Sequence, residues 1–180
     1  DLLERLPVPE SRITVTHLAS DLGPAVADGS EPVPEGPYFV YVGSRAPYKN
    51  FDRLLAAMAN LRAVGREGRL CVVGVPFSRS EKRRIGALNL SSRVVNYGHV
   101  PDGQLVRLYQ NSTALVYPSM YEGFGIPPLE AMQCGTVVVA ADTSSIPEVV
   151  GNAAVLFDPH RTDQLTDILL ELLRNPAQRE

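Results

Sequence analysis

The chain has 180 residues, of which 44% are hydrophobic and 21% are charged, and its formal net charge is -3 at pH 7. These proportions are typical of one globular domain with a sizeable core. The acidic balance argues against nucleic acid or an anionic membrane as the main partner. No apolar run approaches the roughly 20 residues that span a bilayer, and the first residues do not resemble a secretory signal, so we expect a cytoplasmic protein.

The cysteines and histidines limit the metal chemistry that the chain can support. No histidine lies at ligand spacing from a cysteine or from a second histidine, so we expect no structural zinc site. Cys71 lies in an apolar run and Cys134 in a mostly apolar segment. Two cysteines do not make a disulfide framework, and we expect both to be buried, reduced thiols.

The first 37 residues differ in character from the rest of the chain. Residues 28–37 are rich in proline, glycine and acidic residues, which indicates a linker or loop. Residues 12–18 predict one strand that has no partner helix, as if it belonged to an element elsewhere. We therefore divide the chain into an interdomain strand and linker segment at 1–37 and a separate domain at 38–180.

From residue 38 onward, β-rich apolar runs alternate with helical patterns. In chain order, the expected elements are a strand at 38–43, a helix at 51–61, a strand at 70–74, a helix at 80–88, a strand at 93–98, a helix at 101–109, a strand at 113–118, a helix at 127–134, a strand at 136–140, a helical turn at 147–151, a strand at 153–157 and a helix at 162–173. Asn50 is placed to cap the first helix. Near-continuous apolar strands that alternate with helices predict an α/β fold with a doubly wound, Rossmann-like, six-stranded parallel sheet.

The loop after the first strand carries two cations. Arg45 and Lys49 stand between Gly43 and the first helix, at the edge of the sheet where doubly wound proteins bind ligands. A guanidinium, an ammonium and a helix N-terminus can converge there on a diphosphate. Two solvated surface cations are the alternative. The spacing matches neither a P-loop nor a G-x-G-x-x-G motif.

The most informative segment is Tyr-Glu-Gly-Phe-Gly-Ile-Pro-Pro-Leu-Glu at 121–130. Two glycines let the backbone approach a ligand, and Pro127 or Pro128 is suited to the first helical position, which would leave amides from about 123 to 129 facing the loop. A phosphate would gain the helix dipole there. Glu130 would accept hydrogen bonds from ribose hydroxyls, and Glu122 from hydroxyls of a transferred sugar. A capping acid plus a surface acid is the alternative.

These residues together resemble the retaining family 4 glycosyltransferases, also called glycosyl transferases group 1. Residues 122–130 match the E-x7-E signature of that family, and residues 41–51 are similar to its donor-phosphate loop. Four further stretches complete the likeness, at 98–105, 117–119, 135–139 and 146–149. The resemblance implies the C-terminal, donor-binding half of a two-domain GT-B enzyme, in a mannosyltransferase-like subset, with residues 38–180 as the nucleotide-sugar-binding domain.

The resemblance also implies roles for single residues. Arg45 and Lys49 would bind the diphosphate and stabilise its developing charge, and Glu122 would bind the donor sugar, which makes these three the expected catalytic residues. Glu130 would hold the ribose. Further donor contacts would come from Gly43 and from the backbone of Gly123, Phe124, Gly125 and Ile126. The chain departs from the family at Ser44, which separates Gly43 from Arg45.

The expected function is donor binding within a retaining hexosyltransferase of polysaccharide biosynthesis that transfers a hexosyl group, mannosyl from GDP-mannose in our first hypothesis, to an acceptor hydroxyl. The expected partners are a GDP- or UDP-hexose, an N-terminal acceptor domain and, through that domain, the inner face of a membrane; no nucleic acid is expected. The chain has no Asp-x-Asp pair, so we expect no metal and no other cofactor.

Three alternatives remain at the level of the sequence. The first is a nucleotide-binding module that is not catalytic on its own. The second is another GT-B enzyme, such as a nucleotide-sugar epimerase or a glycogen-type synthase. The third is a flavodoxin-like signalling domain, which would need clustered acids after the first strand, where this chain has Arg45 and Lys49.

Overall fold

A computed structural model describes residues 7–14, 16, 18–26 and 32–175 of the chain. Six strands form one sheet: β1 Tyr38–Val42, β2 Arg69–Val73, β3 Val94–Gly98, β4 Ala114–Tyr117, β5 Val138–Ala141 and β6 Val155–Phe157. Their order is β3-β2-β1-β4-β5-β6, and every pairing is parallel. The predicted doubly wound, Rossmann-like sheet is therefore confirmed, and each predicted strand lies within two residues of its expected limits.

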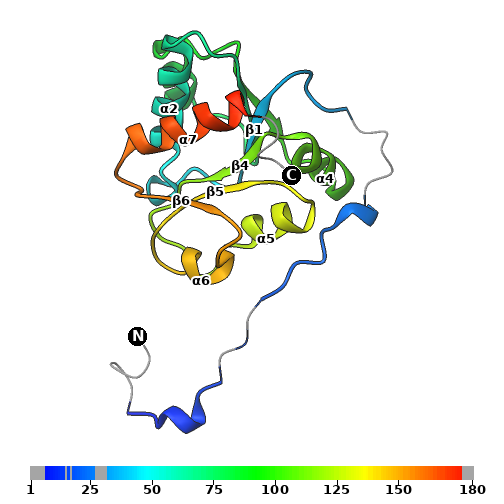
Figure 1. Cartoon of the computed structure of the whole chain (residues 1–180), viewed down its shortest axis with the longest axis vertical. Coiled ribbons are helices and arrows are strands. Elements are labelled where there is room, and N and C mark those ends of the chain that lie inside the picture. The colour runs from blue at the N-terminus through cyan, green and yellow to red at the C-terminus, as the bar shows by residue number, and fades with distance from the viewer. Residues whose placement is uncertain (1–6, 15, 17, 27–31, 176–180) are drawn as a thin grey trace.

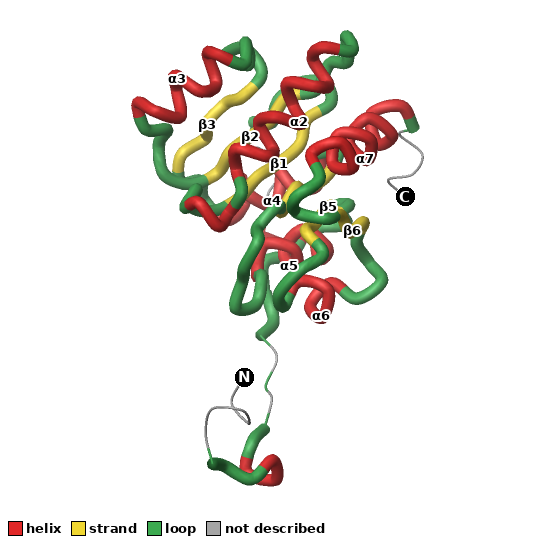
Figure 2. The backbone as a smooth tube through the Cα atoms, turned by 90° about the vertical axis from the view of Figure 1, so that its left-hand side faces the viewer, coloured by secondary structure: helices red, strands yellow, loops and turns green. Residues whose placement is uncertain are grey.

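Helices cover both faces of the sheet. They are α2 Phe51–Ala63, α3 Arg79–Ala87, α4 Asp102–Asn111, α5 Ile126–Gln133, α6 Ile146–Val150 and α7 Thr162–Arg174, with short 3-10 turns η1 Glu10–Arg12, η2 Pro24–Val26 and η3 Pro47–Lys49. Helix α2 packs against α7 on one face, and α5 contacts α4 and α6 on the other (Figures 1 and 2). Right-handed crossovers impose this division because the chain reverses its direction across the sheet after β3.

The core lies on both sides of the central strands. Residues 38–41 of β1 are each no more than 1% exposed, which explains why this strand is apolar at every position rather than at alternate ones. The two edge strands are wetter, with Val95 of β3 and Val155 of β6 exposed. Helix α7 buries Leu165, Leu169 and Leu172, whose spacing places them on one helical face.

One prediction about the start of a helix was wrong, namely that Asn50 caps the first helix. Asn50 precedes α2, but its side chain makes no capping hydrogen bond, and its backbone is left-handed, with φ 57° and ψ 30°. The amide instead donates to Pro118 O at 3.1 Å and to Pro159 O at 2.9 Å. The η3 turn ends directly at Asn50, and this turns its side chain away from the helix and toward two other loops.

The predicted strand at 12–18 is also not found. Arg12 ends the η1 turn, and residues 13, 14, 16 and 18 have no strand assignment; residues 15 and 17 lie outside the described residues, as do residues 28–31 of the expected linker. A strand needs a neighbour for its backbone hydrogen bonds, whereas this segment runs away from the sheet (Figure 1). The chain meets the domain after this segment, through a hydrogen bond from Gln133 to Ser20 O and the burial of Leu22.

Both cysteines are buried free thiols, as expected. Burial raises the pKa of Cys71 to about 12 and that of Cys134 to about 11. Each therefore acts as a small apolar group in the core rather than as a nucleophile.

Candidate functional site

The candidate site lies where the loops after β1 and β4 meet. These two strands are neighbours in the sheet although three helices and two strands separate them in sequence, and the strand order reverses between them. In doubly wound folds this reversal leaves a crevice at the carboxyl ends of the strands. Backbone and side-chain contacts join the two loops: Met120 N donates to Tyr48 O at 2.7 Å, and Asn50 donates to Pro118 O.

An ion pair between Lys49 and Glu122 crosses this junction. Lys49 Nζ lies 2.6 Å from Oε1 and 2.9 Å from Oε2 of Glu122. The side chains are only 16% and 10% exposed, so solvent screens the pair weakly. The ammonium also lies 5.8 Å from the centroid of the Tyr117 ring. Burial and the nearby Glu122 carboxylate raise the pKa of Tyr117, which keeps this phenol neutral.

The segment between Glu122 and α5 presents free backbone donors. The amides of residues 123–126 have no hydrogen-bond acceptor within the described part of the chain. Gly125 is the N-cap of α5, with φ 115° and ψ 67°, a conformation that L side chains rarely adopt. Helix α5 begins at Ile126, slightly earlier than expected, and Pro127 and Pro128 carry no N–H. The donors expected from about 123 to 129 are thus narrowed to 123–126, beside a helix N-terminus that attracts anions.

Glu130 lies one turn into α5 and faces α4. Its Oε2 accepts a hydrogen bond from the hydroxyl of Tyr109 at 3.0 Å, and Tyr109 is fully buried. Burial raises the pKa of Glu130 above its usual value, although the Tyr109 hydrogen bond opposes this shift. The two glutamates of the E-x7-E segment therefore have different partners: Glu122 pairs with a cation, and Glu130 with a phenol.

Arg45 is directed to a different place from Lys49. Its Nε forms an ion pair with Glu81 of α3, and its Nη2 donates to the backbone oxygens of Val75 and Pro76 at 2.9 and 3.0 Å. The guanidinium lies 5.0 Å from the Phe77 ring centroid, and the side chain is 4% exposed. The structure thus brings Lys49 and Glu122 together, but it places Arg45 between the β1 and β2 loops.

A cavity of about 330 Å³ opens at the carboxyl ends of the first three strands. It is lined by Val42, Gly43, Ser44, Val73, Gly74, Val75, His99, Val100 and Leu105. Two glycines make the close approach of the β1 and β2 loops feasible, because a Cβ on Gly74 would lie 2.6 Å from Gly43 O. Leu105 is one helical turn before Tyr109 on α4, so the cavity and Glu130 are adjacent along that helix.

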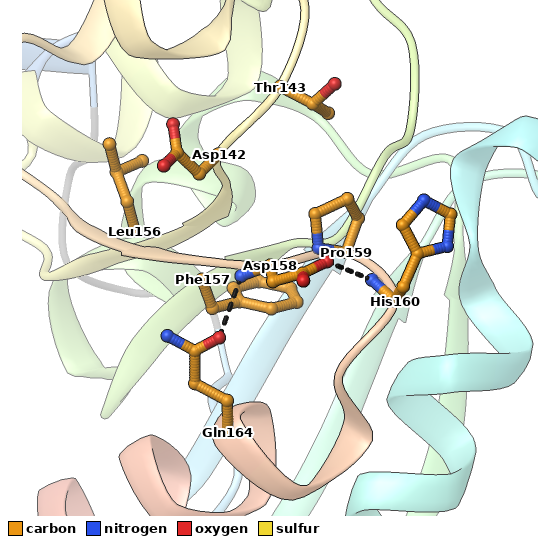
Figure 3. Close-up of a pocket in the computed structure, with 8 residues that line it drawn as sticks. All are labelled: Asp142, Thr143, Leu156, Phe157, Asp158, Pro159, His160 and Gln164. Atoms are coloured by element: carbon orange, nitrogen blue, oxygen red, sulfur yellow. Dashed lines mark hydrogen bonds between the residues drawn. The ribbon is translucent and has the colours of Figure 1, made fainter.

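A second cavity, of about 430 Å³, lies at the carboxyl ends of β5 and β6 (Figure 3). Asp142 and Asp158 are part of its lining, which makes it unsuitable for a phosphate. The dashed lines in Figure 3 show Gln164 accepting from the Asp158 amide and Asp158 accepting from the His160 amide, contacts that fix the turn before α7. His160 is exposed in this loop.

Several residues of the site were not among the predicted site residues. Gly74, Val75 and Val100 line the apolar cavity, and Ser144 and Ser145 hydrogen-bond the backbone of the Glu122 segment. Their common signal in the sequence is position, because each ends or follows a predicted strand. Residue type gives no further clue, since small, apolar and hydroxyl residues are common in such loops.

The described residues were also compared with the requirements of a metal site and of a membrane-spanning helix. No group of three or more histidine, cysteine, aspartate or glutamate side chains is placed to hold a metal ion there. None of the helices in that part of the chain has both the length and the apolar character needed to cross a bilayer.

Comparison with known proteins agrees with this architecture. The model of the family described as "Glycosyl transferases group 1" matches residues 27–180. The O-antigen chain mannosyltransferase B of Escherichia coli is 33% identical over 191 aligned residues, which cover 100% of this chain and 50% of that protein. The MMP alpha-(1->4)-mannosyltransferase of Mycolicibacterium hassiacum is 37% identical over 137 residues, 73% of this chain and 33% of that protein.

A solved structure gives the same result for the fold. Sucrose-phosphate synthase from Thermosynechococcus elongatus superposes with a TM-score of 0.70 and 30% identity, over 81% of this chain and 38% of that one. The chain therefore spans half or less of the length of these relatives. By fold, by the family match and by the identity of its relatives, the chain belongs to the glycosyl transferases group 1 family.

Proposed function

We propose that the chain is the nucleotide-sugar donor-binding domain of a retaining hexosyltransferase. The observation that carries the proposal is the Lys49–Glu122 pair at the β1–β4 junction, next to four amides at the start of α5 that have no acceptor among the described residues. A cation, free N–H groups and a carboxylate in one crevice match a ligand that carries both an anionic diphosphate and sugar hydroxyls.

Lys49 and the amides of residues 123–126 would hold the diphosphate. The α5 N-terminus adds ~0.3–1 kcal/mol for an exposed anion, and up to about 2 kcal/mol for a partly buried one. Lys49 would turn from Glu122 toward the phosphates, which frees the carboxylate to accept hydrogen bonds from sugar hydroxyls. The same donors would stabilise the charge that develops on the leaving diphosphate while the acceptor hydroxyl attacks on the same face.

The rest of the donor fits the adjacent features. The apolar cavity near Val100 and Leu105 can hold a nucleobase, and the free oxygen of Glu130 can accept from the ribose. We do not place Arg45 among the phosphate ligands, because its Nε and Nη2 bond Glu81 and the β2 loop, and its Nη1, which has no hydrogen-bond partner among the described residues, is buried. We assign it to fixing the Gly43–Lys49 loop. No metal is required in this proposal, since Lys49 and the amides supply the positive charge.

A mannosyl donor is the preferred hypothesis because the sequence relatives include mannosyltransferases. The acceptor, and any membrane contact, would be set by a second domain, as in the two-domain architecture that the sequence resembles. A nucleotide-binding module that is inactive alone is the second candidate, and it is favoured by the share of each relative that the chain covers.

The test is calorimetric titration of the chain with GDP, UDP, ADP and GDP-mannose. We expect binding of GDP, tighter binding of GDP-mannose, and loss of that difference in Glu122→Gln. Failure of every nucleotide to bind would refute the proposal. Transfer of mannose to an added acceptor by this chain alone would refute the second candidate.

A further inference from the structure

Two serines in the loop after β5 contact the backbone of the Glu122 segment, and nothing in the proposed donor contacts uses them. From their geometry we infer that Ser144 and Ser145 are positioning residues that fix residues 122–124 and thereby aim the Glu122 carboxylate and the adjacent free amides at the donor. The inference rests on the proposed function and adds to it the residues that determine recognition of the sugar.

The hydrogen bonds fix both the backbone N–H and the backbone C=O of Glu122. Ser144 Oγ accepts from Glu122 N at 3.2 Å and donates to Glu122 O at 2.7 Å. Ser145 Oγ lies 2.9 Å from Glu122 O and 2.9 Å from Phe124 O, so it shares its proton between two carbonyls. With Lys49 on the carboxylate, both the main chain and the side chain of Glu122 are held.

The β5 loop adopts an unfavourable backbone conformation to provide these contacts. Ser144 has a φ of 59°, a left-handed conformation that is unusual for a residue other than glycine, asparagine or aspartate. Such conformations persist only where the surroundings determine them, and they concentrate at functional sites. In this conformation Ser144 makes hydrogen bonds to both the N–H and the C=O of Glu122.

Ser145 also lacks the hydrogen bond that is usual at its position. It is the N-cap of α6, where a serine hydroxyl normally bonds an amide of its own helix, yet it makes no capping bond here. The hydroxyl is given to Glu122 and Phe124 instead. Both serines thus make hydrogen bonds to the Glu122 loop at the expense of stability in their own loop.

That loop needs external support because of its composition. Residues 123 and 125 are glycines, and the amides of residues 123–126 bond to nothing within the described residues. A flexible loop of this kind would lose much entropy on meeting a ligand, whereas a fixed one presents its donors ready-oriented. The serines supply this preorganisation for the sugar side of the donor.

The experiment compares the affinities of GDP and GDP-mannose for this chain in four variants. In Ser144→Ala, Ser144→Gly and Ser145→Ala we expect the preference for GDP-mannose over GDP to fall about 5- to 10-fold, with a smaller fall in the affinity for GDP itself, because the diphosphate that both ligands share also contacts the amides of this loop. Ser145→Thr keeps the hydroxyl and should keep the preference. Thermal unfolding distinguishes an effect on the placement of Glu122 from an effect on stability. Ser144→Gly relieves the left-handed backbone strain, so it should have a higher melting temperature than Ser144→Ala. Both variants should nevertheless lose the preference for GDP-mannose equally.

Ser112→Ala is the matched control. Its hydroxyl also donates to a backbone carbonyl, that of Tyr109 at 2.9 Å, next to the part of the site proposed for the ribose, which GDP and GDP-mannose share. It should lower the melting temperature and leave the sugar preference unchanged. A preference that is unchanged in all serine variants, or that follows melting temperature across the set, would overturn the inference.

Hydrogen exchange of the Glu122 amide gives a readout that needs no ligand. Loss of the Ser144 hydroxyl should speed exchange of this amide at least 5-fold, and Ser112→Ala should not. If the parent chain binds no nucleotide while this acceleration is seen, the proposed function fails and the positioning contact stands. If nucleotide binding is intact and exchange is unchanged, the positioning inference alone fails.

Discussion

Lys49 and Arg45 have the same charge and stand four residues apart, yet they have different partners in the structure. Lys49 pairs with Glu122 across the β1–β4 junction, whereas Arg45 is enclosed between Phe77 and Glu81. The sequence treated them as one phosphate-binding pair. Their separation follows from side-chain packing, because the aromatic ring and the acid that receive Arg45 come from the next strand-to-helix loop and from α3.

Replacement of each cation by methionine tests whether Lys49 binds the diphosphate and Arg45 fixes the loop. Lys49→Met should weaken GDP binding about 10- to 100-fold, the loss of one charge-assisted hydrogen bond, and should also lower the free energy of unfolding by ~1–3 kcal/mol, because the shielded Glu122 carboxylate loses its partner. Arg45→Met should lower the free energy of unfolding by ~1–3 kcal/mol, because Glu81 and two carbonyls lose a shielded donor. Calorimetry and urea unfolding measure the two effects. A larger loss of GDP affinity in Arg45→Met than in Lys49→Met would return Arg45 to the diphosphate.

Glu130 gives a prediction on pH dependence. Burial raises the pKa of its carboxyl in the folded chain. At a pH between the lower pKa of the unfolded chain and the higher pKa of the folded chain, Glu130 is protonated in the folded chain and ionised in the unfolded chain. The free energy of unfolding therefore falls as pH rises from about 4.5 through the folded pKa. Glu130→Gln keeps a partner for Tyr109 and does not titrate. Its stability relative to the parent should therefore increase between pH 4 and pH 7.

Urea unfolding of the parent and Glu130→Gln at several pH values measures that difference. Glu81→Gln serves as the comparison of opposite sign: burial opposes the shift, but hydrogen bonds from Arg45 and Ser78 lower the pKa of Glu81. Glu81 therefore adds stability above its unfolded pKa, and this stability is lost as pH falls through the folded value. A parent-minus-variant difference for Glu130 that is flat with pH would contradict the assigned shift.

Among the elements, the β1 and β2 loops depend on a close backbone contact that only glycine permits. Gly74 has a φ of 136°, and its Cα faces Gly43 O. Gly74→Ala should lower the free energy of unfolding by more than about 2 kcal/mol, through backbone strain and a clash that no flexible side chain can relieve. The same change should reduce GDP affinity, because it moves the wall of the apolar cavity.

Gly65→Ala is the matched control for this element. Gly65 also has a positive φ, 70°, but a Cβ there would meet nothing within 4 Å. It should cost about 1 kcal/mol from backbone conformation alone and leave GDP affinity unchanged. Equal destabilisation by the two substitutions would show that the contact with Gly43 does not matter.

For the whole molecule, the strand order determines where the donor can bind. Because β1 lies next to β4, the loops that carry Lys49 and Glu122 converge, although 73 residues separate the two side chains. Binding would then depend on Lys49 and backbone donors rather than on a metal. GDP-mannose affinity should be the same in EDTA and in added Mg²⁺ or Mn²⁺, measured by calorimetry. A fall in affinity of tenfold or more on chelation would contradict this expectation.

The six strands, the helices between them and the edge of the sheet at which the distinctive loops gather could all be predicted from the amino-acid sequence. These follow from apolar runs and helical spacing, which are local properties of the chain and survive in any arrangement of the strands. The sequence also placed both acids of the 121–130 segment and Lys49 among the candidate residues, through the loops that follow β1 and β4.

Which side chains contact one another depends on the three-dimensional arrangement of the chain. This arrangement paired Arg45 with Glu81 and not with the Lys49 site, turned Asn50 from a cap into a bridge between loops, and brought Ser144 and Ser145 onto the backbone of Glu122. It also left residues 12–14, 16 and 18, the described part of the segment 12–18, without a strand partner. Each of these depends on which loops and edges become neighbours after the strands assemble, and such long-range adjacency leaves no periodic pattern in the sequence.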